Sequence, residues 1–135
     1  MLKKFIFTML MSSILFFQPW VYGKDGGKKV QPAAVITMSN LLKFEPAEVT
    51  VTAGETVLWK NSSLLVHTVT ADSSLVANPA NVALPKGAAP FNSGNIEPEG
   101  TFQHTFTVPG KYRYFCIPHE AAKMIGEIIV KPKPE

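Results

Sequence analysis

From residue 33 to residue 132 the chain consists of short apolar runs separated by turn residues. Within most runs apolar and polar side chains alternate, which is the period of a β-strand with one buried face. The largest gap, 78–100, holds four prolines, and prolines at that spacing exclude a helix of useful length. The pattern therefore predicts an all-β fold: an antiparallel Greek-key β-sandwich or barrel of about seven to eight strands.

The expected strands are bounded by turn signals. Ala53-Gly54 lies between two alternating runs and predicts a hairpin there, and Pro109-Gly110 joins two further runs. The gap 78–100 is long for a small domain, so we expect it to have a function or short structure of its own. The runs lie at 33–38, 49–51, 57–59, 67–71, 101–107, 111–116 and 126–132.

The first residues have the pattern of an export signal. Lys3 and Lys4 precede an apolar run over 5–17, and small residues follow at Val21 and Gly23. A membrane anchor is the alternative, but the run is short for a span, which needs about 20 apolar residues. We therefore expect a cleaved signal peptide at 1–23 and no stable membrane association after cleavage. The chain would then work in the periplasm or another extracytoplasmic space.

The rest of the chain divides simply. Residues 24–32 are polar and glycine-bearing and are expected to form a flexible leader, followed by a single domain at 33–132 and a tail at 133–135. Of the 13 basic residues, Lys3 and Lys4 lie in the signal segment, so 11 remain against 10 acidic residues. This near-neutral balance, without a basic run interleaved with aromatics, argues against a nucleic-acid partner.

Cys116 is the only cysteine of the chain. Thiols of exported proteins normally pair, because their compartment is oxidising. A single cysteine there indicates an intermolecular disulfide, a reactive thiol or a metal ligand.

The neighbours of Cys116 favour the metal. His119 and Met124 follow it within one short loop, and His67 stands at the start of the run 67–71. Two histidines, a cysteine and a weak axial methionine are the ligand set of a blue-copper electron-transfer site. Zinc accepts the thiolate and the imidazoles, but the soft thioether is suited to copper.

Each residue also has an ordinary interpretation. Cys116 could be a small buried apolar residue, Met124 could fill space in the core, and His67 could be a hydrogen-bonded strand residue. Taken together, these interpretations leave the unpaired thiol and the grouping of ligand types unexplained. His104 lies in the middle of the run 101–107 among polar residues, and we expect a surface or packed residue there, not a ligand.

The stretch YRYFCIPHEAAKMIGEIIV resembles the ligand loop and last strand of the cupredoxins, and its Cys-x-x-His-x-x-x-x-Met spacing is similar to that of plastocyanin and pseudoazurin. The resemblance extends through FEPAEVTVTAGETVLWKNSSLLVHTVTA and FNSGNIEPEGTFQHTFTVPG and covers 33–132. It implies one type 1 copper ion per chain, bound by His67, Cys116, His119 and Met124. Thr68 departs from the asparagine of plastocyanins, which ties the ligand loop to the strand; we expect its hydroxyl to make a similar hydrogen bond.

The resemblance implies a carrier of single electrons between redox proteins. Phe115 and Ile117 flank Cys116 where related copper enzymes have further histidines, so we expect no enzymatic activity. A copper-binding protein for storage or delivery is the alternative, although only Met38 and Met124 lie outside the signal segment. A structural module that has lost its metal is a third.

Partners are expected to dock near His119, which the resemblance makes the ligand at the solvent edge. Apolar residues flank the ligands in sequence and would form a rim suited to brief contacts, as in weak redox encounters. We expect a monomer. The rim residues are Leu64, Leu65, Val66, Pro118, Ala121 and Ala122.

Overall fold

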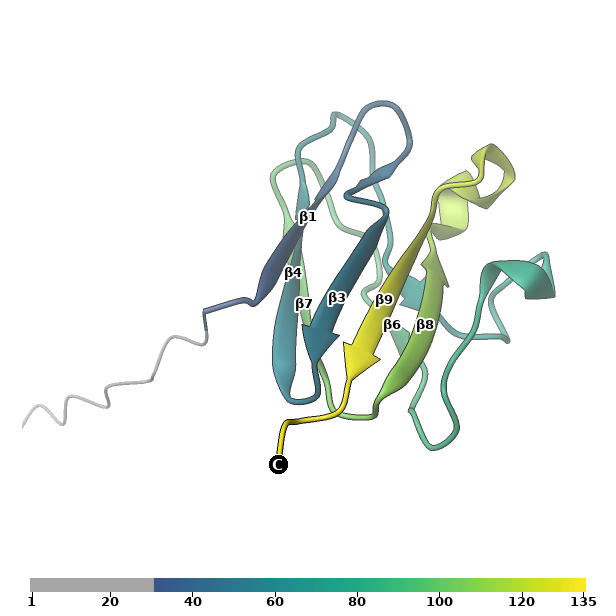
Figure 1. The fold of residues 1–135 in the computed structure, drawn as a ribbon. Coiled ribbons are helices and arrows are strands. Elements are labelled where there is room, and N and C mark those ends of the chain that lie inside the picture. The colour runs from purple at the N-terminus through teal and green to yellow at the C-terminus, as the bar shows by residue number, and fades with distance from the viewer. Residues whose placement is uncertain (1–30) are drawn as a thin grey trace, which may run out of the picture.

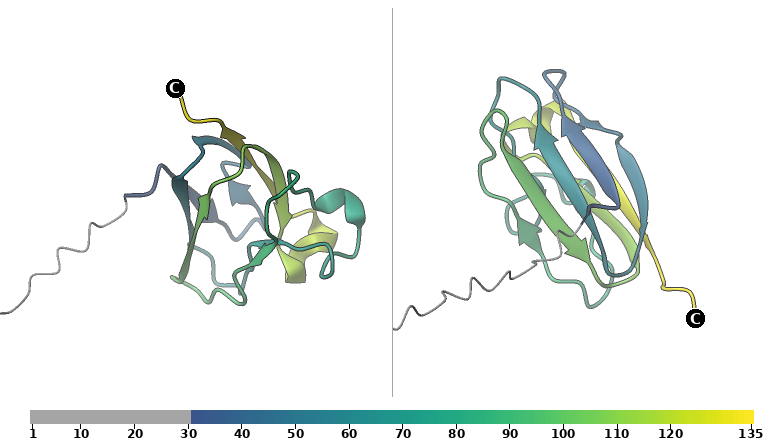
Figure 2. Two further views of the ribbon diagram at one scale, coloured as in Figure 1. Left: turned by 90° about the horizontal axis from the view of Figure 1, so that it is seen from below. Right: turned by 90° about the vertical axis from the view of Figure 1, so that its left-hand side faces the viewer.

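The computed structural model describes residues 31–135, which form two facing β-sheets (Figures 1 and 2). The predicted signal peptide and most of the leader lie outside the described residues. One sheet has the order β2-β1-β4-β7 and the other β3-β9-β8-β5-β6. The strands are β1 (Ala34–Met38), β2 (Phe44–Glu45), β3 (Glu48–Thr52), β4 (Glu55–Asn61), β5 (Thr70–Ala71), β6 (Phe91–Asn92), β7 (Thr101–Phe106), β8 (Gly110–Phe115) and β9 (Ile125–Lys131).

The β-sandwich is as expected, but the pairing of its strands corrects the prediction. The sheets are mixed, because β1 pairs with β4 in parallel and β3 pairs with β9 in parallel. The predicted hairpin over 49–59 is wrong: the chain turns at Gly54, where φ is +95°, but β3 and β4 belong to different sheets. Alternation of side chains reveals a strand with one buried face and says nothing about its partner.

Strand lengths also differ from the expectation. The described residues contain nine strands, three of which (β2, β5 and β6) have only two residues. The run 67–71 forms a strand only at its end, in β5, while His67 makes an isolated bridge to Ile96. His67 therefore lies in the segment between β4 and β5, outside the regular strands.

Large aromatic side chains join the two sheets in the core. Tyr114 of β8 packs edge-on against Trp59 of β4, with ring centroids 5.5 Å apart, and its hydroxyl accepts a hydrogen bond of 3.1 Å from the indole Nε1. Phe44 of β2 also packs edge-on against Tyr114, with ring centroids 4.7 Å apart. All three side chains are almost fully buried. Tyr114 is two residues before Cys116, so this packing fixes the end of the strand from which the ligand loop begins.

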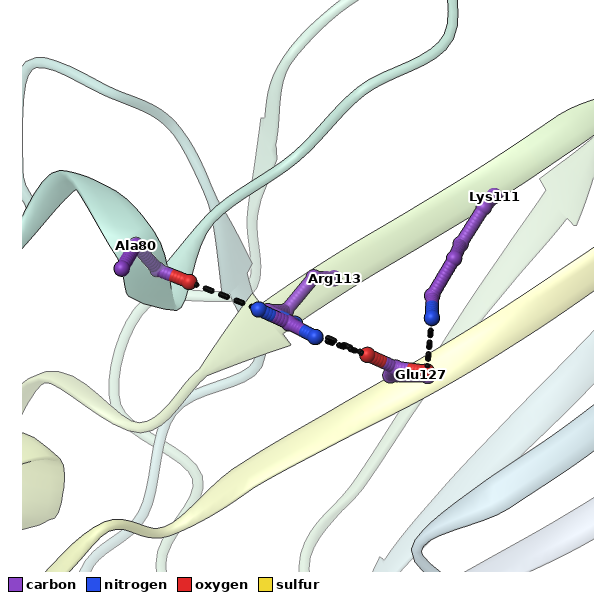
Figure 3. A network of polar contacts seen from close by, with 4 residues as sticks. All are labelled: Ala80, Lys111, Arg113 and Glu127. Carbon is purple, nitrogen blue, oxygen red and sulfur yellow. Dashed lines mark hydrogen bonds and ion pairs between the residues drawn. The ribbon is translucent and has the colours of Figure 1, made fainter.

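The segment 78–100 has short structure of its own, as expected. It contains the 3-10 turn η1 (Pro79–Asn81) and β6, and a bridge between Ala83 and Arg113 joins it to β8. The guanidinium of Arg113 donates to the carbonyl of Ala80 at 2.9 Å and to the carboxylate of Glu127, which also pairs with Lys111 at 2.7 Å (Figure 3). These contacts attach η1 to β8 and β9.

A second 3-10 element, η2 (Ile117–Ala122), lies between β8 and β9 at the end of the molecule away from the C-terminus (Figure 1). Neither turn approaches the length of a membrane span, and no helix among residues 31–135 is long and apolar enough to cross a bilayer.

Candidate metal centre

The ligand loop, residues 116–124, is closed by backbone hydrogen bonds. Cys116 follows directly after β8, and its N–H donates to the carbonyl of Met124 at 3.0 Å. Met124 donates in turn to the carbonyl of His119 at 3.2 Å, and His119 donates to the carbonyl of Cys116 at 3.1 Å. Lys123, with φ of 59°, provides the left-handed residue that ends η2. The loop therefore holds three predicted ligands within one compact turn.

His67 comes from a different part of the chain. Its backbone exchanges two hydrogen bonds with Ile96, at 3.2 and 2.8 Å, and its side chain is fully buried. The next residue, Thr68, reaches the ligand loop: its N–H lies 3.3 Å from the Cys116 sulfur, and its hydroxyl accepts from the N–H of Ile117 at 2.8 Å. The expectation that the Thr68 hydroxyl ties the loop to the strand is confirmed.

The two histidines and the cysteine converge on one point. The Sγ atom of Cys116 lies 3.6 Å from Nδ1 of His67 and 3.4 Å from Nδ1 of His119. The three ligand atoms all lie within 4.8 Å of one another. Metal bonds of about 2.0 Å to imidazole and about 2.3 Å to thiolate place nitrogen and sulfur roughly 3.5–3.7 Å apart at tetrahedral to trigonal angles. The spacing fits a single shared metal ion.

Burial shifts the pKa values of two side chains of this cluster. Exclusion of water raises the pKa of the Cys116 thiol, because the thiolate is the charged form. The pKa of His67 is lowered, first by burial and second by the neighbouring His119. Neutral imidazoles are the form that binds metal, and a bound cation would deprotonate the thiol. His119 is the partly exposed member of the cluster.

Met124 and His104 complete the predicted candidates. Met124 is fully buried, and its backbone hydrogen bond to His119 keeps it beside the cluster. His104 in β7 lies in an aromatic group, with its ring centroid 4.3 Å from that of Phe91. It does not belong to the His–Cys–His cluster, in agreement with the expectation of a packed strand residue.

Two neighbours of the ligands were missed from the sequence. The hydroxyl of Ser63 lies 2.8 Å from Nε2 of His67. The carboxylate of Glu120 accepts hydrogen bonds from the N–H groups of Ala77 and Asn78, both at 2.9 Å. No motif marks either residue, since Ser63 follows another serine, Ser62, and the partners of Glu120 lie more than 40 residues upstream.

The sequence of residues 32–131 matches a known family, described as "Copper binding proteins, plastocyanin/azurin family". The chain belongs to this family. As a member whose folded chain gathers a His–Cys–His cluster, it is a copper-binding cupredoxin.

Individual cupredoxins show how far the likeness extends. The chain is 34% identical over 105 residues to chloroplastic plastocyanin of Oryza sativa subsp. indica, a match that covers 78% of this chain and 66% of the relative. It is 37% identical over 93 residues to plastocyanin of Scenedesmus fuscus, covering 69% of this chain and 91% of the relative. With chloroplastic plastocyanin of Tetradesmus obliquus, 37% identical, the match covers 61% of the relative, so the chain spans just under two thirds of the length of these chloroplastic relatives.

Among solved structures, amicyanin is similar in fold. An amicyanin mutant in its Cu(I) form superposes with a TM-score of 0.59 at 27% identity, covering 77% of this chain and 87% of amicyanin. A second amicyanin mutant, in its reduced Cu(I) form at pH 4, superposes with a TM-score of 0.58 at 30% identity, covering 76% and 87%. Both likenesses support the cupredoxin fold.

Proposed function

We propose that this protein is a blue-copper electron carrier. His67, Cys116, His119 and Met124 would hold one type 1 copper ion, and the protein would pass single electrons between partner proteins. The observation that carries the proposal is the convergence of the two Nδ1 atoms on the Cys116 sulfur, at 3.6 and 3.4 Å. The names of the relatives, plastocyanin and amicyanin, support the same conclusion.

Copper bound at this site supplies a Cu(I)/Cu(II) couple. The hydrogen bonds of the surrounding chain would limit the movement of the ligands when the copper changes oxidation state. Backbone bonds close the loop between Cys116 and Met124, and the Thr68 hydroxyl fixes the loop to the strand. Burial of Cys116 excludes water from the sulfur. Ligands that move little when the copper ion gains an electron favour rapid one-electron exchange.

The wider setting belongs to the same proposal. The family match over 32–131 supports a single copper-binding domain at 33–132. The signal peptide at 1–23 and the leader at 24–32 are proposed from the sequence pattern alone. We infer an extracytoplasmic location, either the periplasm or another extracytoplasmic space. Phe115 and Ile117 beside Cys116 support a carrier without enzymatic activity.

The test is a visible spectrum of the purified protein loaded with Cu(II), with Cys116→Ser as the control. We expect an intense blue or green thiolate-to-copper band that the serine variant lacks. A nearly colourless copper complex, or a spectrum indifferent to Cys116, would contradict the proposed site.

The proposed docking surface is the apolar rim, the set of apolar residues that flank the ligands in sequence. Leu64 is 84% exposed and Leu65 is 43% exposed, and Pro118, Ala121 and Ala122 are also exposed, while Val66 is half-buried. Exposed apolar side chains that flank the ligands in sequence suit partners that dock briefly over a small area. We propose that this protein is a monomer, that redox proteins dock on this rim, and that electrons enter and leave through His119.

Charging the rim tests this surface. We expect Leu64→Glu and Ala121→Glu to slow electron transfer to a physiological partner at least tenfold, because a carboxylate would be desolvated at the contact. Stopped-flow mixing of reduced carrier with oxidised partner measures the rate. Val35→Glu is the matched control, since Val35 is 50% exposed on β1. Equal rates for the rim variants and the control would exclude the rim as the docking site.

A further inference from the structure

A buried chain of polar side chains stands behind His67, on the side away from Cys116. While Nδ1 of His67 faces the Cys116 sulfur, Nε2 lies 2.8 Å from the hydroxyl of Ser63. That hydroxyl lies 2.8 Å from Oδ1 of Asn61. Exposed fractions are 0% for His67, 2% for Ser63 and 0% for Asn61. These groups must satisfy one another, because buried polar atoms without partners are costly.

The orientation of Asn61 is fixed by two carbonyls. Its Nδ2 donates to the carbonyl of Leu65 at 2.7 Å and to the carbonyl of Ile96 at 3.0 Å. Only the amide nitrogen can donate to a carbonyl, so Oδ1 must point the other way, toward Ser63. There it accepts from the N–H of Ser63 at 2.9 Å as well as from its hydroxyl.

This orientation determines the direction of the remaining hydrogen bonds. Ser63 has one hydroxyl proton, and two acceptors that carry no proton lie near it: Oδ1 of Asn61 at 2.8 Å and the carbonyl of Leu65 at 3.1 Å. The Ser63 hydroxyl therefore donates its proton toward Asn61 and the carbonyl of Leu65, away from His67. Toward His67 the hydroxyl oxygen can only accept, so the proton between them belongs to Nε2. Nδ1 then keeps its lone pair, aimed at Cys116.

We propose that Ser63, oriented by Asn61, is a positioning residue that holds His67 in the Nε2–H tautomer and so presents Nδ1 to the copper ion. The tautomer follows from the polar chain alone, while the role toward copper rests on the proposed function. A hydrogen bond from the far nitrogen of a ligating imidazole also raises its basicity as a ligand. Among residues 31–135, no side-chain partner occurs at Nε2 of His119, so the two histidines differ in this respect.

The tautomer is measured without any metal. The protein is labelled with ¹⁵N-histidine, and long-range ¹H–¹⁵N correlation spectra of the apo form are recorded at a pH where all three imidazoles are neutral. We expect His67 to show only the Nε2–H tautomer. In Ser63→Ala we expect an Nδ1–H population to appear. Ser62→Ala is the matched control, because Ser62 is the exposed neighbour in the same loop, and it should leave the His67 signals unchanged.

A second variant separates the hydroxyl from packing. Ser63→Thr keeps the hydroxyl and should retain the wild-type tautomer, whereas a change caused by altered packing would appear in both Ser63 variants. The proposal is overturned if wild-type His67 is the Nδ1–H tautomer, or if Ser63→Ala remains exclusively Nε2–H.

The role toward the metal has its own readouts. We expect Ser63→Ala to lower the affinity for Cu(II) about tenfold, the lower end of the usual effect of losing an outer hydrogen bond. We also expect the reduction potential of this variant to rise. A less basic imidazole is a weaker donor, and the loss destabilises Cu(II) more than it destabilises Cu(I). Unchanged affinity and potential would overturn the role of Ser63 toward copper. If Cu(II) binding is indifferent to Cys116 while the apo tautomers respond as expected, the proposed function fails and the tautomer assignment stands.

Discussion

At the scale of single residues, the hydroxyl of Thr68 connects the two chain segments that carry the ligands. Thr68 follows His67, and its hydroxyl accepts from the N–H of Ile117, which follows Cys116. The hydroxyl of Thr70 donates to the same oxygen at 3.0 Å. Because Thr68 is 2% exposed, water does not readily replace its hydroxyl. One side chain thus maintains the spacing between the two sides of the cluster.

Removing this hydroxyl should loosen the ligand loop. We expect Thr68→Val, which preserves shape, to lower the free energy of unfolding of the apo protein by about 1 kcal/mol, the net value of one hydrogen bond. The Ile117 amide should also exchange with solvent several-fold faster. Thr68→Ser keeps the hydroxyl and should leave the Ile117 exchange rate near that of the wild type. Equally fast exchange in the serine and valine variants would mean that the hydroxyl does not hold the loop.

The His–Cys–His cluster was predictable from sequence at this scale, while its supports were only partly so. Donor chemistry and close spacing in one loop indicated Cys116 and His119 without coordinates, and Met124 as a ligand stays a prediction. The Thr68 hydrogen bond could be expected from the resemblance. Ser63 could not, because its contact with His67 depends on how the loop between β4 and His67 curves, and its neighbour Ser62 is chemically identical.

At the scale of elements, Glu120 fastens the ligand loop to the segment that includes η1. Its carboxylate accepts from the N–H groups of Ala77 and Asn78 and from Nδ2 of Asn81 at 2.8 Å. These hydrogen bonds, that from Ala77 foremost, lower the pKa of Glu120, so its charged form is favoured. Since Glu120 adjoins His119, the same contact supports the exposed ligand.

Loss of this contact should be visible in the segment it holds. We expect Glu120→Ala to speed amide exchange at Ala77 and Asn78 about five- to tenfold, the equivalent of roughly 1 kcal/mol for the lost hydrogen bonds. Exchange in the core strands should not change. Glu97→Ala is the control, because Glu97 is an exposed glutamate of the segment 78–100 outside this contact. Unaltered exchange at both amides would show that Glu120 does not restrain the segment.

The pairing of strands shows a limit of prediction from the sequence. The alternation of buried Val49 and Val51 with exposed residues located β3 correctly. The same alternation could not reveal that β3 does not pair with β4, which follows it in the chain. It pairs instead in parallel with β9, more than 70 residues later. Partner choice is set by the packing of both sheets together, so the local pattern located the longer strands but neither their order nor the two-residue strands β2 and β6.

At the scale of the whole molecule, the packing of Tyr114 against Trp59 and Phe44 joins the two sheets. A glycine in the neighbouring strand makes this possible: a Cβ at Gly126 would lie 2.3 Å from Cζ and Oη of the Tyr114 ring. The ring cannot move aside, because it is fully buried and hydrogen-bonded to Trp59. The close approach of β9 to Tyr114 therefore requires glycine.

A methyl group at this position should separate the sheets. We expect Gly126→Ala to lower the free energy of unfolding by about 3 kcal/mol, at the upper end of overpacking costs. Gly87→Ala is the control: no atom lies within 4 Å of its added Cβ, so only the strain of its φ of +87° remains, about 1 kcal/mol. Chemical denaturation of the apo proteins measures both. Equal losses in the two variants would contradict the role given to Tyr114.

The central claim, a carrier of single electrons, is tested most directly by a coulometric redox titration of the copper-loaded protein, followed through its thiolate-to-copper band. The account predicts that one electron per chain abolishes the band, that reoxidation restores it fully, and that copper remains bound through repeated cycles. Release of copper on reduction, or a band that fails to return, would contradict the account and favour storage or delivery of copper instead.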